Sequence, residues 1–283
     1  MFYGSSGSSV SAKQARTGVP DVAIVGAPRC GTTSIADALS KHPSFCVAQP
    51  KEPFFFERDY FRGTNWYEKK FFKHWQQGQL MIDARAFNLW IKYCAPRIYE
   101  ANASCMIVII VRDPIEQMFS MWSHMDAMRP GRVRPFPRAV AYAADHYRMF
   151  NFRYEEEYVP FMDPKGGTYK PFFFECCEYA SNITRFKQYF SQVGIFLYDD
   201  LVENPERFMG NLTRWVKPRA PDVVLWKIPV KKLNTSSQDT SSSSIRERFP
   251  EEVHMITIRL RDEVKRLGKM IDIDLIEKWG WDV

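Results

Sequence analysis

A loop that could bind a phosphate lies near the start of the chain. Its sequence, Gly26-Ala-Pro-Arg-Cys-Gly31-Thr32-Thr33, has the GxxxxGK[ST] spacing of the loop that wraps nucleoside triphosphates, except that Thr32 stands in the lysine position. An apolar run at 22–25 precedes the loop and a helix-like run follows it, which is the context such a loop needs. Without the lysine, backbone amides, hydroxyls and the helix N-terminus can still cradle one phosphate. The sequence therefore predicts a nucleotide with a short, differently charged 5′ end.

A second phosphate site is predicted at the end of another apolar run. Residues 106–111 read MIVIIV, which is typical of a buried parallel strand. Arg112 follows directly, and Ser120 stands eight residues further on, in the helix predicted after Pro114. An arginine at a strand end and a serine on the next helix can converge on one anion. This segment therefore predicts a second anion-binding site.

These two segments, VGAPRCGTTS and VRDPIEQMFSMWSH, resemble the two nucleotide-binding signatures of the sulfotransferase family. Residues 50–55, PKEPFF, resemble the KEPxFF stretch of carbohydrate-type and many bacterial members. Weaker similarities follow at Asn65-Trp66-Tyr67, at Tyr198–Leu201 before Asn204-Pro205, and at Leu267-Gly268 followed by Trp279. The resemblance covers about residues 21–283. It implies the donor 3′-phosphoadenosine-5′-phosphosulfate (PAPS), with 3′-phosphoadenosine-5′-phosphate (PAP) as the product.

The resemblance also implies which residues hold the donor. In the family, the first signature binds the 5′-phosphosulfate and the arginine and serine of the second bind the 3′-phosphate. The corresponding donor-binding residues here are Arg29, Cys30, Gly31, Thr32, Thr33, Ser34, Arg112 and Ser120. Arg29 occupies the position where the family usually has a lysine beside the oxygen that bridges sulfur and phosphorus. Its charge is permanent, but it cannot donate a proton as a lysine can.

Four residues are candidates for the transfer itself. Glu52 matches the family's catalytic glutamate, a carboxylate that takes the acceptor's proton; the alternative is a capping or surface carboxylate. Lys51 either holds the sulfonate oxygens or is solvated. His124 matches a histidine that some members carry near the sulfonate, or it is an ordinary helix histidine. Arg29 completes the set. Where many carbohydrate members have a lysine, this chain has Ala84 with Arg85 next to it, so either Arg85 substitutes or the acceptor differs.

The composition limits which ligands, partners and locations can be expected. The chain has 283 residues and a net charge of +6, which fits an anionic donor, a polyanionic acceptor or ordinary solubility. No stripe of basic and aromatic residues predicts nucleic-acid binding, and no run of 18 apolar residues predicts a membrane span. Six cysteines without CxxC spacing, and no carboxylate cluster, predict no metal requirement. Four N-x-[ST] sequons, at Asn102, Asn182, Asn211 and Asn234, are a signal for the secretory-pathway (Golgi) lumen. The cytoplasm is an equal alternative for the location of the protein.

Strand and helix signals alternate along the chain. Strands are predicted at 22–25, 45–47, 81–83, 106–111 and 195–198, and helices near 32–41, 65–73, 88–100, 115–126, 137–150, 178–190, 205–216 and 250–267. The pattern predicts a single α/β domain over 21–283, a phosphate-loop-containing parallel sheet with helices on both faces, after a disordered Ser/Gly-rich leader at 1–20. Irregular loops are predicted at 151–175 and 231–244. Both phosphate signatures fall at carboxyl ends of strands, where ligands bind in such folds.

The chain is accordingly expected to be a PAPS-dependent sulfotransferase that acts on an alcohol or amine. The acceptor is a carbohydrate or another polar hydroxyl compound, or alternatively a small-molecule secondary metabolite. A more distant alternative is a phosphate-loop kinase or NTPase, which Thr32 and the Arg112/Ser120 pair disfavour. Another is an inactive nucleotide-binding homologue, which the presence of Glu52 and Arg29 disfavours.

Overall fold

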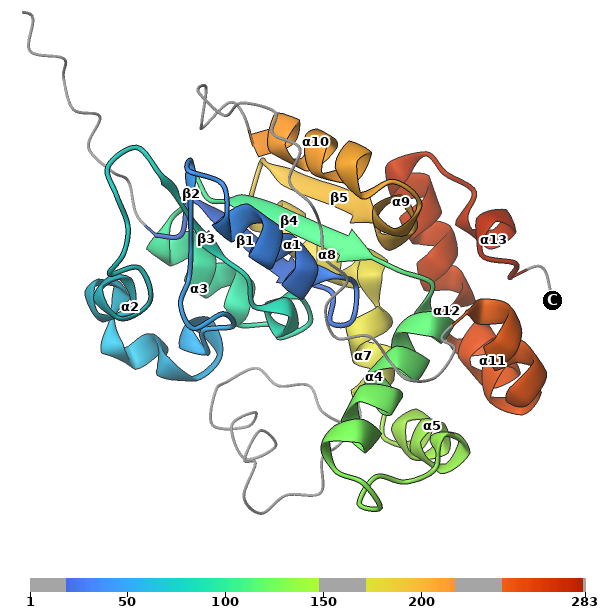
Figure 1. Ribbon diagram of the computed structural model, residues 1–283. Helices are drawn as coiled ribbons and strands as arrows, with labels where there is room; N and C mark the ends of the chain where they lie inside the picture. The colour runs from blue at the N-terminus through green and yellow to red at the C-terminus, as the bar shows by residue number, and fades with distance from the viewer. Residues whose placement is uncertain (1–18, 148–171, 217–240, 282–283) are drawn as a thin grey trace, which may run out of the picture.

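Five parallel strands form the centre of the computed structural model, which describes residues 19–147, 172–216 and 241–281 (Figure 1). The strands lie in the order β2-β3-β1-β4-β5. Their bounds are β1 Val22–Gly26, β2 Phe45–Val47, β3 Leu80–Asp83, β4 Met106–Val111 and β5 Val193–Leu197. All six residues of β4 are buried, as expected of a central strand covered on both faces. The predicted α/β fold with a parallel sheet is confirmed.

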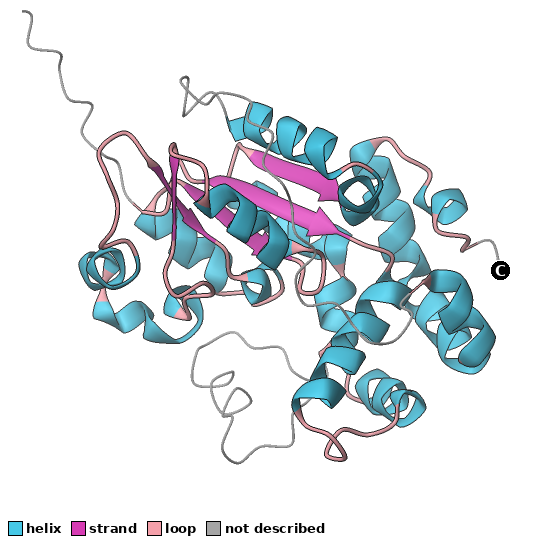
Figure 2. Cartoon of the chain, viewed as in Figure 1, coloured by secondary structure: helices cyan, strands magenta, loops and turns pink. Residues whose placement is uncertain are grey.

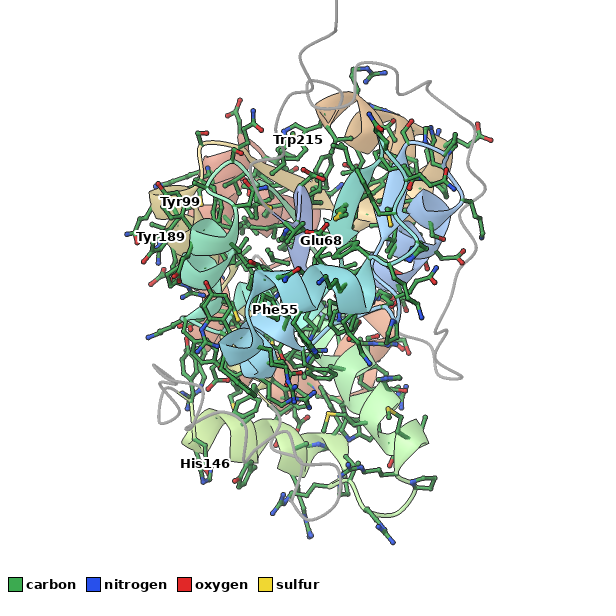
Figure 3. All side chains as sticks on the ribbon, turned by 90° about the vertical axis from the view of Figure 1, so that its left-hand side faces the viewer. Phe55, Glu68, Tyr99, His146, Tyr189 and Trp215 are labelled. Carbon is green, nitrogen blue, oxygen red and sulfur yellow. The ribbon has the colours of Figure 1, made fainter. Side chains whose placement is uncertain are left out.

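Helices cover both faces of this sheet (Figure 2). The helix α1 lies in front of it in Figure 1, and α3 and α8 lie behind it, where Tyr99 and Tyr189 bring their rings to 5.8 Å (Figure 3). The described α-helices are α1 (Thr32–Ser40), α2 (Thr64–Phe71), α3 (Cys94–Ala101), α4 (Pro114–Met128), α5 (Phe136–Asp145), α7 (Phe173–Cys177), α8 (Tyr179–Tyr189), α9 (Tyr198–Glu203), α10 (Pro205–Val216), α11 (Ser242–Arg248), α12 (Pro250–Ile271) and α13 (Leu275–Lys278).

The chain between β2 and β3 makes an aromatic excursion. It contains a π-helix, η1 (Phe55–Asp59), and a short 3-10 helix, η2 (Tyr60–Arg62), before α2. Phe55 is fully buried and stacks on Tyr67 of α2 with ring centroids 4.3 Å apart (Figure 3). This packing fixes the excursion against the sheet. It thereby sets the position of the predicted site residues Lys51 and Glu52, which come just before it.

Several predicted elements need correction. One helix over 88–100 is wrong: a 3-10 helix, η3 (Ala86–Leu89), precedes α3, which begins two residues before Pro96 because proline is tolerated only in a first helical turn. The last strand covers Val193–Leu197, and Tyr198 already begins α9. Parts of the predicted loops 151–175 and 231–244 are helical, in α7 and α11; the rest of both lies outside the described residues, as does most of the predicted leader.

The sequons and cysteines are placed clearly. Asn102 and Asn182 are buried and donate to the carbonyls of Pro20 and Glu175, so neither amide is available to a glycan in this fold. Asn211 is exposed on α10, and Asn234 lies outside the described residues. All six cysteines are free and buried. Within the described ranges, no helix has the length and apolarity needed to cross a bilayer.

Candidate active site

The phosphate loop joins β1 to α1 at the carboxyl edge of the sheet. Gly31 has a φ of 79°, and an added Cβ there would lie 2.6 Å from Cδ2 of Leu201. Only glycine therefore suits this position, because other residues would be strained there and would meet α9 as well. The helix α1 begins at Thr32, the next residue, with Thr33 and Ser34 in its first turn. The first amides of a helix have no partner within the helix, so this turn could bind an anion.

Arg29 connects the loop to α4. Its backbone is left-handed, with a φ of 65°, and its Nε donates to Oγ of Ser120 at 3.2 Å. Nη1 of Arg112 in turn lies 3.4 Å from the carbonyl oxygen of Arg29. Burial, followed by the charge of Arg112, lowers the pKa of the Arg29 guanidinium. The structure thus brings Arg29 together with Arg112 and Ser120, which lie more than 80 residues away in the sequence and were predicted to bind the other end of the nucleotide.

Cys30 has a different position from the rest of the loop. Its side chain is fully buried, its thiol contacts the carbonyl of Pro28 at 3.6 Å, and its amide donates to the carbonyl of Ala27. Burial raises the pKa of the thiol to about 12. Gln117, which was not predicted as a site residue, donates to the carbonyl oxygen of Pro28 at 3.0 Å and so connects the loop to α4. The Cys30 side chain therefore belongs to the interior that supports the loop.

Arg112 is held by two groups that the sequence analysis did not identify. Its Nε and Nη2 each lie 2.9 Å from Oε2 of Glu116, one helical turn later on α4. The ring of Tyr198, directly after β5, lies 4.5 Å from the guanidinium carbon. The i,i+4 spacing of Arg112 and Glu116 was a readable signal, whereas the contact with Tyr198 depends on the order of the strands.

Two cations, Lys51 and Arg85, bind the carboxylate of Glu52. Its backbone is left-handed, with a φ of 64°, and one third (33%) of its side chain is exposed. One carboxylate oxygen pairs with Nζ of Lys51, and the other accepts from Nη1 of Arg85 at 2.7 Å. Burial alone would raise the pKa of this carboxyl, but the two cations outweigh it and the net effect lowers the pKa. Glu52 is therefore held ionised, with enough exposure to meet a ligand.

Arg85 is itself anchored in the interior. It follows β3, is almost fully buried, and uses Nε and Nη2 to hold both oxygens of Glu57, which is completely buried. Burial raises the pKa of Glu57, and the charge of Arg85 opposes that rise. The ring of Phe54 lies 4.2 Å from the guanidinium carbon. Glu57 went unrecognised in the sequence, since only the fold pairs two side chains 28 residues apart.

His124 lies one turn beyond Ser120 on the same face of α4. Burial and then the charge of Arg29 lower the pKa of its imidazole, while Glu52 raises it. Arg29 likewise feels the charge of Glu52. The predicted catalytic groups Arg29, Glu52 and His124 therefore share one electrostatic environment, although they come from three separate segments of the chain.

The arrangement can bind an anionic donor and accept a proton. Cations from the loop and from the segments that follow β2, β3 and β4 gather at the carboxyl edge of the sheet, beside one ionised carboxylate. Among the described residues, no group of three or more His, Cys, Asp or Glu side chains could hold a metal ion. A cavity of about 420 Å³ lies along β2 between residues 40 and 79, and none of the predicted site residues lines it.

Comparisons with known proteins agree with this geometry. Residues 19–248 match the sulfotransferase domain family. Human heparan sulfate glucosamine 3-O-sulfotransferase 6 is 27% identical over 139 residues, 49% of this chain and 40% of that enzyme. The membrane-associated sulfotransferase kil1 of Dictyostelium discoideum is 27% identical over 106 residues, 37% of this chain and 22% of that protein. This chain thus spans less than half the length of either relative.

The fold has a counterpart among solved structures. A sulfotransferase from Alicyclobacillus acidocaldarius superposes with a TM-score of 0.67 at 21% sequence identity. The superposition covers 92% of this chain and 98% of that chain. At this identity the likeness concerns the fold, and it extends over nearly the whole of both chains.

Proposed function

Because the chain belongs to the sulfotransferase domain family, we propose that it moves a sulfonate group from PAPS to a hydroxyl or amine of a carbohydrate or another polar hydroxyl compound. The observation that carries the proposal is the position of Glu52, an ionised carboxylate held by Lys51 and Arg85 within the field of Arg29. A group-transfer site needs such a proton acceptor beside the cations that bind the donor.

The proposed step is an in-line displacement at sulfur. The acceptor oxygen or nitrogen forms a bond to sulfur while the bond from sulfur to the 5′-phosphate oxygen breaks. The acceptor's proton passes to Glu52, and PAP leaves with the extra negative charge. Arg29 stabilises the charge that builds on the bridging oxygen, and Lys51 is available to the sulfonate oxygens. As in phosphoryl transfer, positioning and charge stabilisation supply most of the rate enhancement.

The donor is assigned to the two phosphate sites. The 5′-phosphosulfate would lie on the loop, at the amides and hydroxyls of Gly31, Thr32, Thr33 and Ser34. The 3′-phosphate would lie between Arg112 and Ser120, whose side chains are joined through Arg29. Support for a carbohydrate acceptor comes from the KEPFF stretch at 51–55 and from the similarity to a heparan sulfate 3-O-sulfotransferase.

Sulfonate transfer from labelled PAPS tests the proposal directly. The acceptor panel contains unsulfated and sulfated glycosaminoglycan oligosaccharides, neutral oligosaccharides, and small phenols, alcohols and amines. Transfer to a glycan with little transfer to the small compounds supports the carbohydrate assignment, whereas the reverse ranking supports the small-metabolite alternative. The same assay in excess EDTA should keep its rate. A rate that collapses on chelation and returns with magnesium, together with ATP turnover, would favour an NTPase instead.

A further inference from the structure

The last residues of the described chain contact two aspartates, one next to Arg112 of the proposed 3′-phosphate clamp (Arg112 and Ser120) and one next to Tyr198. These last residues lie beyond residue 248, where the match to the family ends. Nε1 of Trp281 donates to Oδ1 of Asp113 at 3.1 Å, and Nε1 of Trp279 donates to Oδ2 of Asp199 at 3.2 Å. Both tryptophans are buried, Trp281 completely. Between them Gly280 has a φ of 64°, a conformation that suits glycine and turns the chain.

Asp113 directly adjoins Arg112 of the 3′-phosphate clamp, and Asp199 adjoins a residue that contacts Arg112. Asp113 follows Arg112, and its Oδ1 also accepts from the amide of Ile115, so it caps α4. Asp199 follows Tyr198, whose ring lies against the Arg112 guanidinium. The two indoles therefore hold the backbone next to Arg112 and the segment that places the ring of Tyr198 against the Arg112 guanidinium.

A third connection reaches Arg112 through α11. Oε1 of Glu116, whose other oxygen holds Arg112, accepts from the amide of Ser242 at 2.9 Å. Arg246 then donates to Oγ of Ser242 at 3.1 Å and to the carbonyl oxygen of Trp279 at 3.0 Å. Together these contacts form a ring of interactions. It leads from Arg112 through Glu116 and α11 to Trp279, and returns to Arg112 through Asp199 and Tyr198.

We propose that the C-terminal segment Trp279–Trp281 is a positioning element of the 3′-phosphate clamp, and that it determines how strongly the site prefers a nucleotide with a 3′-phosphate over one without. The segment touches neither phosphate. It acts by holding Arg112 at the angle that its guanidinium needs, through Asp113 on one side and Asp199 on the other. This inference rests on the proposed function, because it takes the donor to be a 3′-phosphorylated nucleotide.

Calorimetric titration with PAP and with AMP tests the inference without any acceptor. The two nucleotides differ only in the 3′-phosphate, so the ratio of their dissociation constants measures that group's contribution. Trp281→Phe keeps an aromatic ring but removes the N–H together with part of the indole, and the control below accounts for the lost volume. The ratio should fall by about 3- to 10-fold, the range that corresponds to one lost hydrogen bond, with AMP affinity nearly unchanged. Trp279→Phe should act in the same direction and serves as the second variant if Trp281→Phe does not fold.

The control is Trp215→Phe. Trp215 lies on α10 (Figure 3), packs its ring 6.2 Å from that of Phe196, and takes no part in the contacts that lead from Trp279 and Trp281 to Arg112. It should lower stability without changing the ratio. An unchanged ratio in both C-terminal variants would overturn the inference, as would an equal fall in the Trp215→Phe control. A wild-type protein that binds PAP and AMP equally would instead contradict the donor assignment, and Arg112→Ala, which should abolish the preference, marks the expected lower limit.

Discussion

Nη1 of Arg85 lies 2.7 Å from Oε2 of Glu52, while the other two nitrogens of the same guanidinium hold Glu57. A buried, immobile arginine thus joins the proposed base to a fully buried carboxylate. Such a planar, three-nitrogen group cannot be replaced by an ammonium without losing part of the arrangement. The relationship explains how a partly exposed glutamate with a left-handed backbone keeps one orientation.

Arg85→Lys tests this role. A lysine keeps the positive charge, but its single nitrogen cannot hold Glu57 with two bonds and Glu52 with a third. Turnover should fall by at least about 10-fold while PAP affinity stays unchanged, because a misplaced base slows transfer strongly. Arg97→Lys is the matched control, since Arg97 donates to the carbonyl of Phe56 and lies against the rings of Tyr60 and Tyr93. Wild-type turnover in Arg85→Lys would contradict a positioning role.

The sheet could be predicted because its strands are apolar runs, and such runs can be recognised without knowing which distant residues they contact. The phosphate loop and Arg112 were readable for a similar reason, since each motif is local. The interrupted helix at 88–100 was missed although Pro96 marked its true start. The roles of Glu57, Trp279 and Trp281 could not be predicted, because they arise from contacts between residues that lie 28, 80 and 168 positions apart in the sequence.

The stability of the fold should decrease as the pH rises from about 5 to about 8. Burial raises the pKa of both Asp83 and Asp113 to about 7, against ~3.9 for an ordinary aspartate. The folded state therefore holds protons that the unfolded state has released above pH ~4, so the stability they contribute falls progressively as the pH rises from ~4 to about 7 and is gone above that pH. Each group accounts for at most about 1.4 kcal/mol per pH unit.

Asp83→Asn should remove one part of this slope. Asparagine keeps an oxygen that can accept from the hydroxyl of Tyr67 but cannot ionise. Urea unfolding at pH 5, 6, 7 and 8 measures the effect: the variant should lose less stability than the wild type between pH 5 and pH 8. A variant as pH-dependent as the wild type would show that Asp83 is not the group that titrates.

Gly31→Ala should damage the phosphate loop. The substitution carries the strain of a φ of 79° and brings a Cβ to 2.6 Å from Leu201. PAP affinity should fall by at least about 10-fold, because the amides of the loop must shift. Gly78→Ala is the control: its φ is 92°, but its Cβ meets nothing within 4 Å, so it carries the backbone strain without the clash. Equal effects of the two substitutions on PAP binding would exclude a special role for Gly31.

Glu52→Gln distinguishes a base from a structural carboxylate. The amide has the same shape and reach but cannot take a proton, so turnover should fall by about 10²- to 10⁴-fold. PAP affinity should stay nearly unchanged, because Glu52 is assigned to the acceptor side. A structural Glu52 would instead lower the melting temperature and leave turnover nearly normal in the molecules that remain folded. Measuring PAP binding, melting and turnover on one preparation separates the two roles, and near-wild-type turnover would transfer the base assignment to His124 or another carboxylate.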